Sequence, residues 1–101
     1  MRDEIFGPVT SVLKFSEIEE AIAIANNSEY GLVGGVFSAD QIKTHKVVGE
    51  MQCGAVYVNN WFNMFYDAPF GGYKQSGFGR EMGEEGIESF LETKSVIYDC
   101  N

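Results

Sequence analysis

Short apolar runs divide the first half of the chain and predict three strands. Residues 9–15, 32–38 and 54–59 are rich in β-branched and apolar side chains, which is typical of buried strands. The second run contains Gly34 and Gly35. Glycine weakens a strand unless another backbone or a ligand approaches closely, so we expect a tight contact at these two positions.

The segment after the first strand has the pattern of an amphipathic helix. Ser16 can cap this helix, and Glu19 stands three residues later, as in a capping box. The apolar positions that recur at helical spacing are Ile18, Ala21, Ile22 and Ala25. The side chains of residues 26–28 compete for backbone hydrogen bonds, which predicts the end of the helix there.

A second helix is predicted between the second and third strands. Asp40 can cap it, and it should run to about Met51, with Ile42, Val48 and Met51 facing inward. Strands that alternate with helices of this length indicate βαβ units and a parallel sheet. The predicted fold class is therefore α/β with a parallel βαβαβ unit, whose edges and one face this short chain leaves uncovered.

The character of the sequence changes at residues 60–83. This segment begins with five aromatic residues, Trp61, Phe62, Phe65, Tyr66 and Phe70. A loop this long in a small domain is usually functional. Its glycine-rich part, residues 71–81, lacks the Lys-Ser/Thr pair of a Walker loop and the spacing of a dinucleotide-binding loop. We interpret it as a turn that lets the backbone pass close to other elements.

The end of the chain predicts one more helix and one more strand. Ile87, Phe90 and Leu91 should share one face of the helix, and residues 95–98 should form the strand.

Composition narrows the class of protein. The chain has 101 residues, enough for one small domain, and 45% of them are apolar, which argues against disorder. Seven basic and 15 acidic residues give a net charge of −8, so nucleic acid is not an expected partner. No apolar run approaches the roughly 20 residues that cross a bilayer. No secretory signal precedes the two cysteines, so we expect a reduced, soluble, cytoplasmic protein.

Candidate chemical groups are sparse. His45 is the one histidine of the chain and, with two scattered cysteines, cannot complete a metal site. Neither Cys53 nor Cys100 has a histidine at a suggestive distance, so we expect no catalytic nucleophile and no bound metal. Cys53 beside the third strand is interpreted as a small apolar filler.

Four motifs, in order along the chain, resemble those of the aldehyde dehydrogenase superfamily. They are residues 3–8 (Asp-Glu-Ile-Phe-Gly-Pro), 26–32 (Asn-Asn-Ser-Glu-Tyr-Gly-Leu), 54–59 (Gly-Ala-Val-Tyr-Val-Asn), and 69–77 (Pro-Phe-Gly-Gly-Tyr-Lys-Gln-Ser-Gly) with Gly79, Arg80, Glu81 and Gly83 after it. Together they resemble the C-terminal segment of a family chain, of the betaine aldehyde or aminoaldehyde dehydrogenase kind. The resemblance implies that residues 1–93 belong to the catalytic domain and residues 94–101 to a strand of the oligomerisation arm.

The resemblance also implies an activity and a cofactor. Family members oxidise an aldehyde to a carboxylic acid with NAD or NADP. By resemblance, Glu4 hydrogen-bonds the ribose hydroxyls next to the nicotinamide, and Phe6 packs beside the nicotinamide ring. A carboxylate suits this role because it accepts two such bonds. The residues that normally select NAD or NADP are not in this chain, so both stay open.

The substrate site is implied by position. Asn60 follows the third strand, and residues 61–70 match the loop that lines the aldehyde tunnel of the family, so Asn60, Trp61, Phe62 and Phe70 are the expected substrate-binding residues. Aromatic side chains could hold a quaternary ammonium group, as in betaine aldehyde or trimethylaminobutyraldehyde. A plain hydrophobic lining would equally suit an aromatic or long aliphatic aldehyde. In some relatives the carbonyls matching Lys74 and Gly77 bind potassium, which makes a monovalent cation a further expected ligand.

Two functional classes follow. The nucleophilic cysteine and the general-base glutamate of the family lie upstream of the motif that contains Glu4. The chain is therefore predicted to be inactive alone and to work as part of an aldehyde dehydrogenase, with the rest of the enzyme, a small-molecule aldehyde and further copies of itself as partners. The alternative is a non-catalytic module that keeps the fold and acts through assembly or binding.

Overall fold

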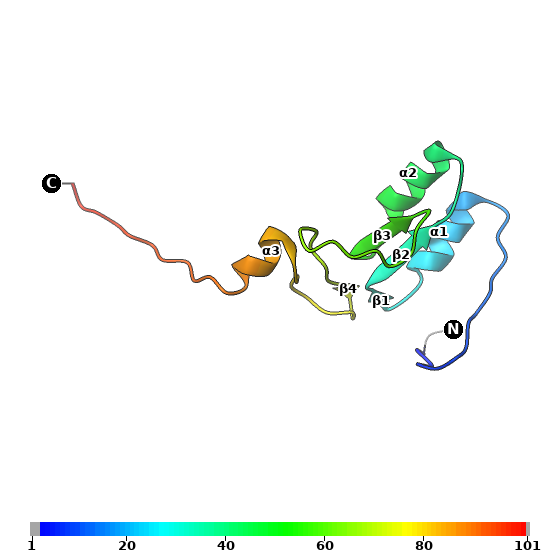
Figure 1. Ribbon diagram of the computed structural model, residues 1–101, viewed down its shortest axis with the longest axis horizontal. Helices are drawn as coiled ribbons and strands as arrows, with labels where there is room; N and C mark the ends of the chain where they lie inside the picture. Colours follow the sequence, from blue (N-terminus) through cyan, green and yellow to red (C-terminus); the bar gives the residue numbers. More distant parts are fainter. Residues whose placement is uncertain (1–2, 101) are drawn as a thin grey trace.

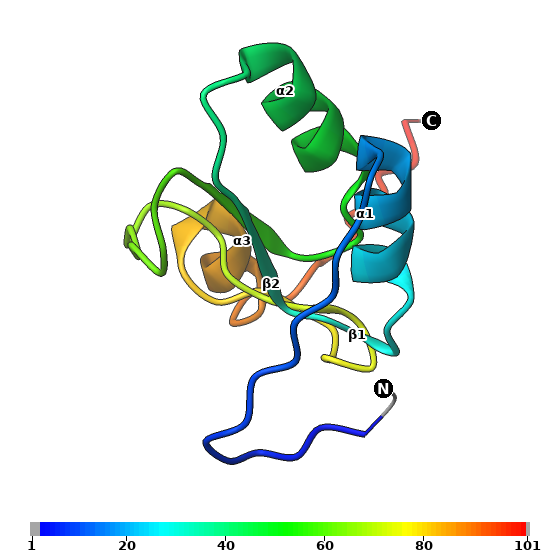
Figure 2. The ribbon, with the colours of Figure 1, turned by 90° about the vertical axis from the view of Figure 1, so that its right-hand side faces the viewer.

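The computed structural model describes residues 3–100 (Figure 1). The elements in chain order are α1 (Ile18–Asn26), β1 (Tyr30–Gly31), β2 (Val33–Val36), α2 (Gln41–Glu50), β3 (Ala55–Val58), β4 (Tyr73–Lys74) and α3 (Gly83–Glu88). The helices α1 and α2 pack against each other beside the strand pair β2–β3 (Figures 1 and 2). The chain is thus a mixed α/β structure, as predicted.

Helix α1 ends where the sequence predicts, but it begins differently. Its N-cap is Glu17, and no side chain caps the helix there. The predicted box of Ser16 and Glu19 is therefore wrong. The Ser16 N–H instead donates to the carboxylate of Glu20 at 2.9 Å, which satisfies a backbone donor just before the first turn. Within the apolar stripe, Ile22 is the most deeply buried hydrophobic side chain among the described residues, at 6% exposed.

Helix α2 begins at the predicted cap. The Asp40 carboxylate accepts hydrogen bonds from the N–H groups of Ile42 and Lys43, at 3.0 and 3.1 Å. These donors have no partner within the helix, so the carboxylate stabilises its start. Ile42 was predicted to face inward and is 84% exposed. The inward position in this turn belongs to Thr44, which is buried and donates its hydroxyl proton to the Asp40 carbonyl at 2.9 Å.

The central sheet has two parallel strands in the described part of the chain, not the predicted three. β2 pairs with β3 in the register Val33↔Ala55 to Val36↔Val58, and α2 forms the crossover between them. Residues 9–15 form no strand, and their apolar side chains are exposed. A strand forms by pairing with a neighbouring strand, and both strand pairs of the described residues, β1–β4 and β2–β3, are made by other segments.

A second pair of strands was not predicted. β1 and β4 are antiparallel, with Tyr30 opposite Lys74 and Gly31 opposite Tyr73. The hydroxyl of Ser76 accepts the N–H of Gly31 at 3.0 Å, which extends the contact beyond the short strands. This pair attaches the glycine-rich segment to the end of the sheet.

Close backbone contacts explain several glycines. A Cβ on Gly54 would collide with the carbonyl oxygen of Gly71, so two backbones meet there without side chains. A Cβ on Gly34 would collide with Met51, and one on Gly35 would lie 2.8 Å from the Trp61 ring. Close contacts are therefore present at Gly34 and Gly35, but side chains make them, not the backbone or ligand that the sequence suggested. The interpretation of the glycine-rich segment as a place of close backbone approach is confirmed, since a Cβ on Gly71 would also collide with the Gly79 carbonyl oxygen.

The C-terminal part departs most from the predictions. α3 ends at Glu88, so Phe90 and Leu91 lie beyond it and are exposed rather than on its face. Residues 95–98 form no strand; they belong to an extended tail that leaves the body of the chain (Figure 1). This tail makes the structure long, with principal dimensions of 69 × 33 × 25 Å.

Candidate functional site

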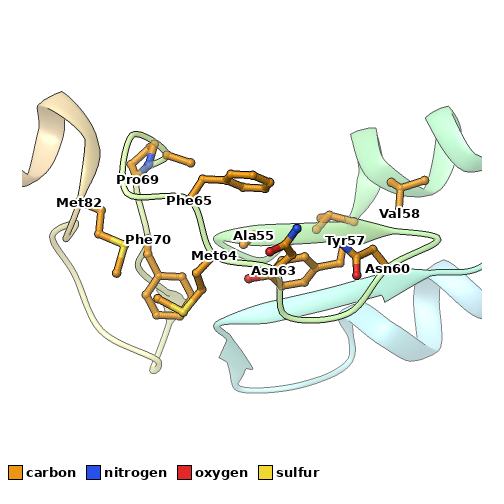
Figure 3. Close-up of a pocket in the computed structure, with 12 residues that line it drawn as sticks. Ala55, Tyr57, Val58, Asn60, Asn63, Met64, Phe65, Pro69, Phe70 and Met82 are labelled. Carbon is orange, nitrogen blue, oxygen red and sulfur yellow. The ribbon is translucent and has the colours of Figure 1, made fainter.

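A hollow of about 320 Å³ lies between β3 and the segment that follows it (Figure 3). Its lining residues are Ala55, Val56, Tyr57, Val58, Asn60, Asn63, Met64, Phe65, Ala68, Pro69, Phe70 and Met82. In Figure 3 the amide side chains of Asn60 and Asn63 lie on the β3 side, and Met82 lies on the side of α3. The hollow therefore has an amide-bearing side and an apolar side.

Asn59 fixes the exit of the chain from β3 into this segment. Its side-chain oxygen accepts the N–H of Ser38 at 2.8 Å, and its amide nitrogen donates to the Ser38 carbonyl at 2.9 Å. Its φ of 51° turns the backbone away from the strand, a conformation that asparagine tolerates better than most residues. The ends of β2 and β3 are thus held together at the point where the hollow begins.

Asn60 and Phe70 mark the two ends of the loop. The side-chain oxygen of Asn60 accepts the N–H of Trp61 at 2.7 Å, which orients the Asn60 amide. Phe70 exchanges two backbone hydrogen bonds with Glu81, both 2.7 Å long. Both predicted residues line the hollow, and backbone-directed hydrogen bonds hold both in place.

Trp61 and Phe62, the other two expected substrate-binding residues, do not line the hollow. Their rings lie near the Tyr57 ring, with centroids at 5.8 and 6.2 Å. Trp61 also covers the backbone of Gly35, as described above. The Trp61 side chain thus packs over β2.

The other lining residues were not among the expected substrate-binding residues, and those with large or polar side chains include Tyr57, Asn63, Met64, Phe65 and Met82. Phe65 belongs to the aromatic segment that drew attention to the loop, so a signal existed for it. Met82 gives no such signal, because it reaches the hollow only after the chain has passed through the glycine-rich segment.

The expected cofactor residues lie on the N-terminal segment. Glu4 is exposed, and the Phe6 side chain is 92% exposed. Phe6 has a φ of 51°, and the N–H of Val9 donates to the Gly7 carbonyl at 2.7 Å, so the backbone makes a tight turn here. The Glu4 carboxylate and the Phe6 ring therefore lie close together in the sequence, and both are exposed to solvent.

The glycine-rich segment is held by two basic side chains. Arg80 donates to the carbonyls of Gly72 and Gly79, at 3.0 and 2.6 Å, and lies 5.6 Å from the centre of the Tyr73 ring. The Lys74 ammonium donates to the carbonyls of Asn26 and Ser28, at 2.8 and 3.1 Å. Since Asn26 ends α1, this positive charge sits at the negative end of the helix dipole.

A monovalent cation was expected to bind the backbone carbonyls of Lys74 and Gly77, which lie in the same segment. The carbonyl of Lys74 accepts the N–H of Gly77 at 3.4 Å, and both residues have positive φ values. The two carbonyls thus belong to one tight turn.

The chemistry of the cysteines does not suit a nucleophile. The Cys53 thiol donates to the Ala55 carbonyl at 3.3 Å, and burial raises the pKa of this thiol above its ordinary value. A nucleophilic cysteine needs the opposite shift. Cys100 is exposed on the extended tail, and both cysteines are free thiols. Within residues 3–100 no group of three or more His, Cys, Asp or Glu side chains is arranged to hold a metal ion.

A sequence profile described as "Aldehyde dehydrogenase family" matches residues 1–96. The chain belongs to this family. Betaine aldehyde dehydrogenase of Vibrio vulnificus is 46% identical over 99 residues, which are 98% of this chain and 20% of the relative. A putative aldehyde dehydrogenase of Staphylococcus saprophyticus is 50% identical over 95 residues, or 94% of this chain and 20% of the relative.

The fold agrees with solved structures of the family. Betaine aldehyde dehydrogenase of Staphylococcus aureus, solved in complex with NAD+, superposes with a TM-score of 0.89 at 48% identity. The superposition covers 92% of this chain and 18% of that chain. The chain thus spans about one fifth of the length of the aldehyde dehydrogenases that it matches. No helix in the described part of the chain is long and apolar enough to cross a membrane.

Proposed function

We propose that this chain is the C-terminal segment of an NAD-dependent aldehyde dehydrogenase and contributes part of its cofactor and aldehyde sites. The family match over residues 1–96 carries this proposal, because it extends across nearly all of the sequence while the chain spans one fifth of its relatives. The activity belongs to the whole enzyme. We expect the chain alone not to oxidise aldehydes, because burial raises the pKa of the Cys53 thiol, whereas a nucleophilic cysteine needs a lowered pKa.

Glu4 and Phe6 are the proposed cofactor residues. The bound cofactor would accept the hydride that leaves the aldehyde carbon. An exposed carboxylate can accept hydrogen bonds from ribose hydroxyls, and an exposed aromatic ring can pack against a planar ring. The exposure of both side chains fits this role, since a binding surface must be open before its ligand covers it.

Asn60 and Phe70 are the proposed substrate residues that line the hollow, and Trp61 and Phe62 support them through Tyr57. Within the whole enzyme we propose that residues 9–15 add a third parallel strand, completing the βαβαβ unit. Residues 95–98 would likewise pair in the arm of a homo-oligomer. Both segments carry large apolar side chains that are exposed, and neither is a strand in this structure.

Several properties of the whole enzyme follow as proposals. NAD use is supported by the NAD+ complex of the staphylococcal relative. The turn at Lys74 and Gly77 would bind a monovalent cation through its carbonyls, and NADP is the alternative cofactor. The enzyme would work in the cytoplasm, where free thiols such as Cys53 and Cys100 persist.

A chimaera tests the proposal directly. Residues 3–100 would replace the matching segment of the Staphylococcus aureus betaine aldehyde dehydrogenase, whose 48% identity makes the replacement structurally conservative. We expect the chimaera to oxidise an aldehyde with NAD+, and the 101-residue chain alone to show no NAD+ reduction. The reaction is followed by NADH absorbance.

Glu4 offers a matched control. Glu4→Gln keeps the shape of the side chain and removes its charge, so the chimaera should bind NAD+ about tenfold more weakly if this carboxylate holds the ribose. Glu17→Gln, a change of an exposed glutamate at the start of α1, should leave NAD+ binding unchanged. A folded chimaera whose affinity for NAD+ is unaffected by Glu4→Gln would contradict the cofactor assignment, and aldehyde oxidation by the isolated chain would contradict the proposed function.

A further inference from the structure

The glycine-rich segment forms a closed loop whose base lies at the hollow. At this base Phe70 and Glu81 exchange two backbone hydrogen bonds of 2.7 Å, and Phe70 and Met82 line the hollow. The Arg80 guanidinium donates to the Gly72 carbonyl at 3.0 Å, which ties the two sides of the loop together. A movement of the loop as a unit would therefore displace Phe70 and Met82.

The tip of this loop is docked on residues 26–31, where β4 lies beside β1 (Figure 1). The N–H of Gln75 and the hydroxyl of Ser76 make hydrogen bonds to that stretch, at 2.9 and 3.0 Å. The Lys74 ammonium adds two more, both to backbone carbonyls at the end of α1. Hydrogen bonds with a charged donor are stronger than those between neutral groups, so Lys74 contributes most to the docking.

Asn26 joins the ends of both helices at the place where Lys74 binds. It is the last residue of α1, and its amide nitrogen donates to the carbonyl of Glu50, the last residue of α2, at 2.8 Å. Its side-chain oxygen accepts the N–H of Gln52 at 2.8 Å, just before β3. A helix carries partial negative charge at its C-terminal end, and in the described structure neither α1 nor α2 has a basic residue in its last turn. Lys74 supplies that positive charge from another segment.

We propose that Lys74 and Asn26 are positioning residues for the aldehyde site, although neither touches the hollow. Lys74 holds the tip of the loop on α1, Asn26 fixes the end of α1 relative to α2 and β3, and the closed loop carries this placement to Phe70. This inference rests on the proposed function, because Phe70 meets an aldehyde only within the whole dehydrogenase. It predicts that weakening the junction of Lys74 and Asn26 impairs aldehyde binding and spares the NAD+ site.

The chimaera provides the test, with betaine aldehyde as substrate, or hexanal if the chimaera oxidises only that, at one fixed potassium concentration. Lys74→Met removes the ammonium and keeps an unbranched side chain. We expect KM for the aldehyde to rise by about threefold to tenfold, with kcat and KM for NAD+ changed by less than about twofold. Binding lost equally before and during the reaction raises KM alone, which is the effect of a displaced wall residue.

Two matched controls separate positioning from general loosening. Lys43→Met removes another exposed lysine, one paired with Asp40, and should leave both KM values unchanged. Asn26→Ala should act as Lys74→Met does, whereas Asn27→Ala, at the next position, should have no effect, because alanine keeps the backbone hydrogen bonds of Asn27. An unchanged KM for the aldehyde in Lys74→Met, or an equal rise in KM for NAD+, would overturn the inference. An unaltered chimaera that folds and binds NAD+ but oxidises neither aldehyde would contradict the proposed function instead.

A double variant tests whether the two residues act through one junction. Because Lys74 binds the carbonyl of the residue whose side chain holds the helices together, Lys74→Met with Asn26→Ala should raise KM for the aldehyde little more than the stronger single change. Single effects that multiply would show independent roles and overturn the shared junction. If Lys74→Met does not fold, Ser76→Ala takes its place, since it removes one bond of the tip and keeps the charge. It should also raise KM for the aldehyde alone, and an unchanged KM would overturn the inference.

Discussion

At the scale of single residues, contacts between backbones decide where glycine is needed. Gly54 and Gly71 meet so closely that no side chain fits between them, whereas a Cβ on Gly49 in α2 would have no neighbour within 4 Å. The absence of a side chain therefore has different consequences at these positions. At Gly54 and Gly71 it allows two segments to touch, and at Gly49 it only lowers the stability of a helix.

This contrast gives the first prediction. Gly54→Ala should lower the free energy of unfolding by about 3 kcal/mol or more, because the strand and the glycine-rich segment must separate. Gly49→Ala should raise it by about 0.5 to 1 kcal/mol, because alanine favours the helix. Urea unfolding followed by circular dichroism measures both, and similar losses from the two variants would contradict the contact described here.

Cys53 gives a second residue-scale prediction. Its thiol has a raised pKa, is half-buried and donates to a carbonyl, so little reactive thiolate forms near neutral pH. Iodoacetamide at a pH of about 7.5 should therefore modify the exposed Cys100 before Cys53, as read by mass spectrometry of timed samples. Faster modification of Cys53 would show an activated thiol and would reopen a nucleophilic role.

At the scale of elements, the sequence predicted those whose partners lie nearby in the chain. α1, α2, β2 and β3 all appear. The apolar stripe of α1, the Asp40 cap of α2 and the short crossover between β2 and β3 are all local features of the sequence. Residues 9–15 and 95–98 have equally apolar sequences and form no strand, since strand formation depends on a neighbour as well as on composition.

The candidate site likewise contains residues that the sequence placed correctly and residues that it did not. Asn60 and Phe70 were expected at the substrate site and line the hollow, and both stand next to features that the sequence reveals: the end of a strand and the start of a glycine-rich turn. Trp61 was expected there because of its place in the aromatic segment. Amino-acid composition does not predict which way a side chain points. The Trp61 ring packs against Gly35, where no side chain stands in its way, and so lies outside the hollow.

The packing of α1 against α2 predicts a pH dependence. Lys46 and Glu19 form a hydrogen-bonded ion pair between the helices, which lowers the pKa of Glu19 from its ordinary value of 4.5 and raises that of Lys46 from 10.5. The stabilisation by Glu19 is present above about pH 4.5 and is lost as the pH falls through its lowered pKa. That by Lys46 is present below about pH 10.5 and is lost as the pH rises through its raised pKa. The Glu19 side chain is 61% exposed and that of Lys46 is 37% exposed, so solvent screens the pair and its effect on stability is small.

NMR can detect this pair even where its energy is small. The carboxyl carbon of Glu19, followed from about pH 2 to 7, should titrate at a higher pH in Lys46→Met than in the unaltered chain. Lys43→Met removes another lysine of the same helix, one whose partner is Asp40, and should leave the Glu19 titration unchanged. Identical Glu19 curves in all three proteins would show that the helices are not joined by this pair.

At the scale of the whole molecule, the chain consists of a small packed body and two extended ends. Among residues 3–100, Ile22 is the one hydrophobic residue that is less than a tenth exposed, at 6%, while Val12, Phe90 and Ile97 are among many large apolar side chains in water. Such exposure is typical of a surface that another protein part covers. It fits a segment that belongs within a larger enzyme.

Amide hydrogen exchange should reveal this organisation. Residues 95–98 should exchange in the isolated chain at rates close to those of an unstructured peptide, and β2 and β3 should exchange more slowly. In the chimaera the tail should become protected, because its backbone groups gain strand partners. A tail that stays unprotected in the folded, oligomeric chimaera would contradict the proposed arm.

The loop between β3 and the glycine-rich segment is fastened at both ends and open in its middle. Asn59 fastens the start through Ser38, and the hydrogen bonds of Phe70 with Glu81 fasten the end, while residues 61–69 are exposed. In evolutionary terms, the residues that fix the loop to the fold and the residues proposed to select the substrate occupy different positions. Substitutions at the exposed positions of the loop, which we propose to face the aldehyde, should therefore leave the strands and helices that carry the loop intact.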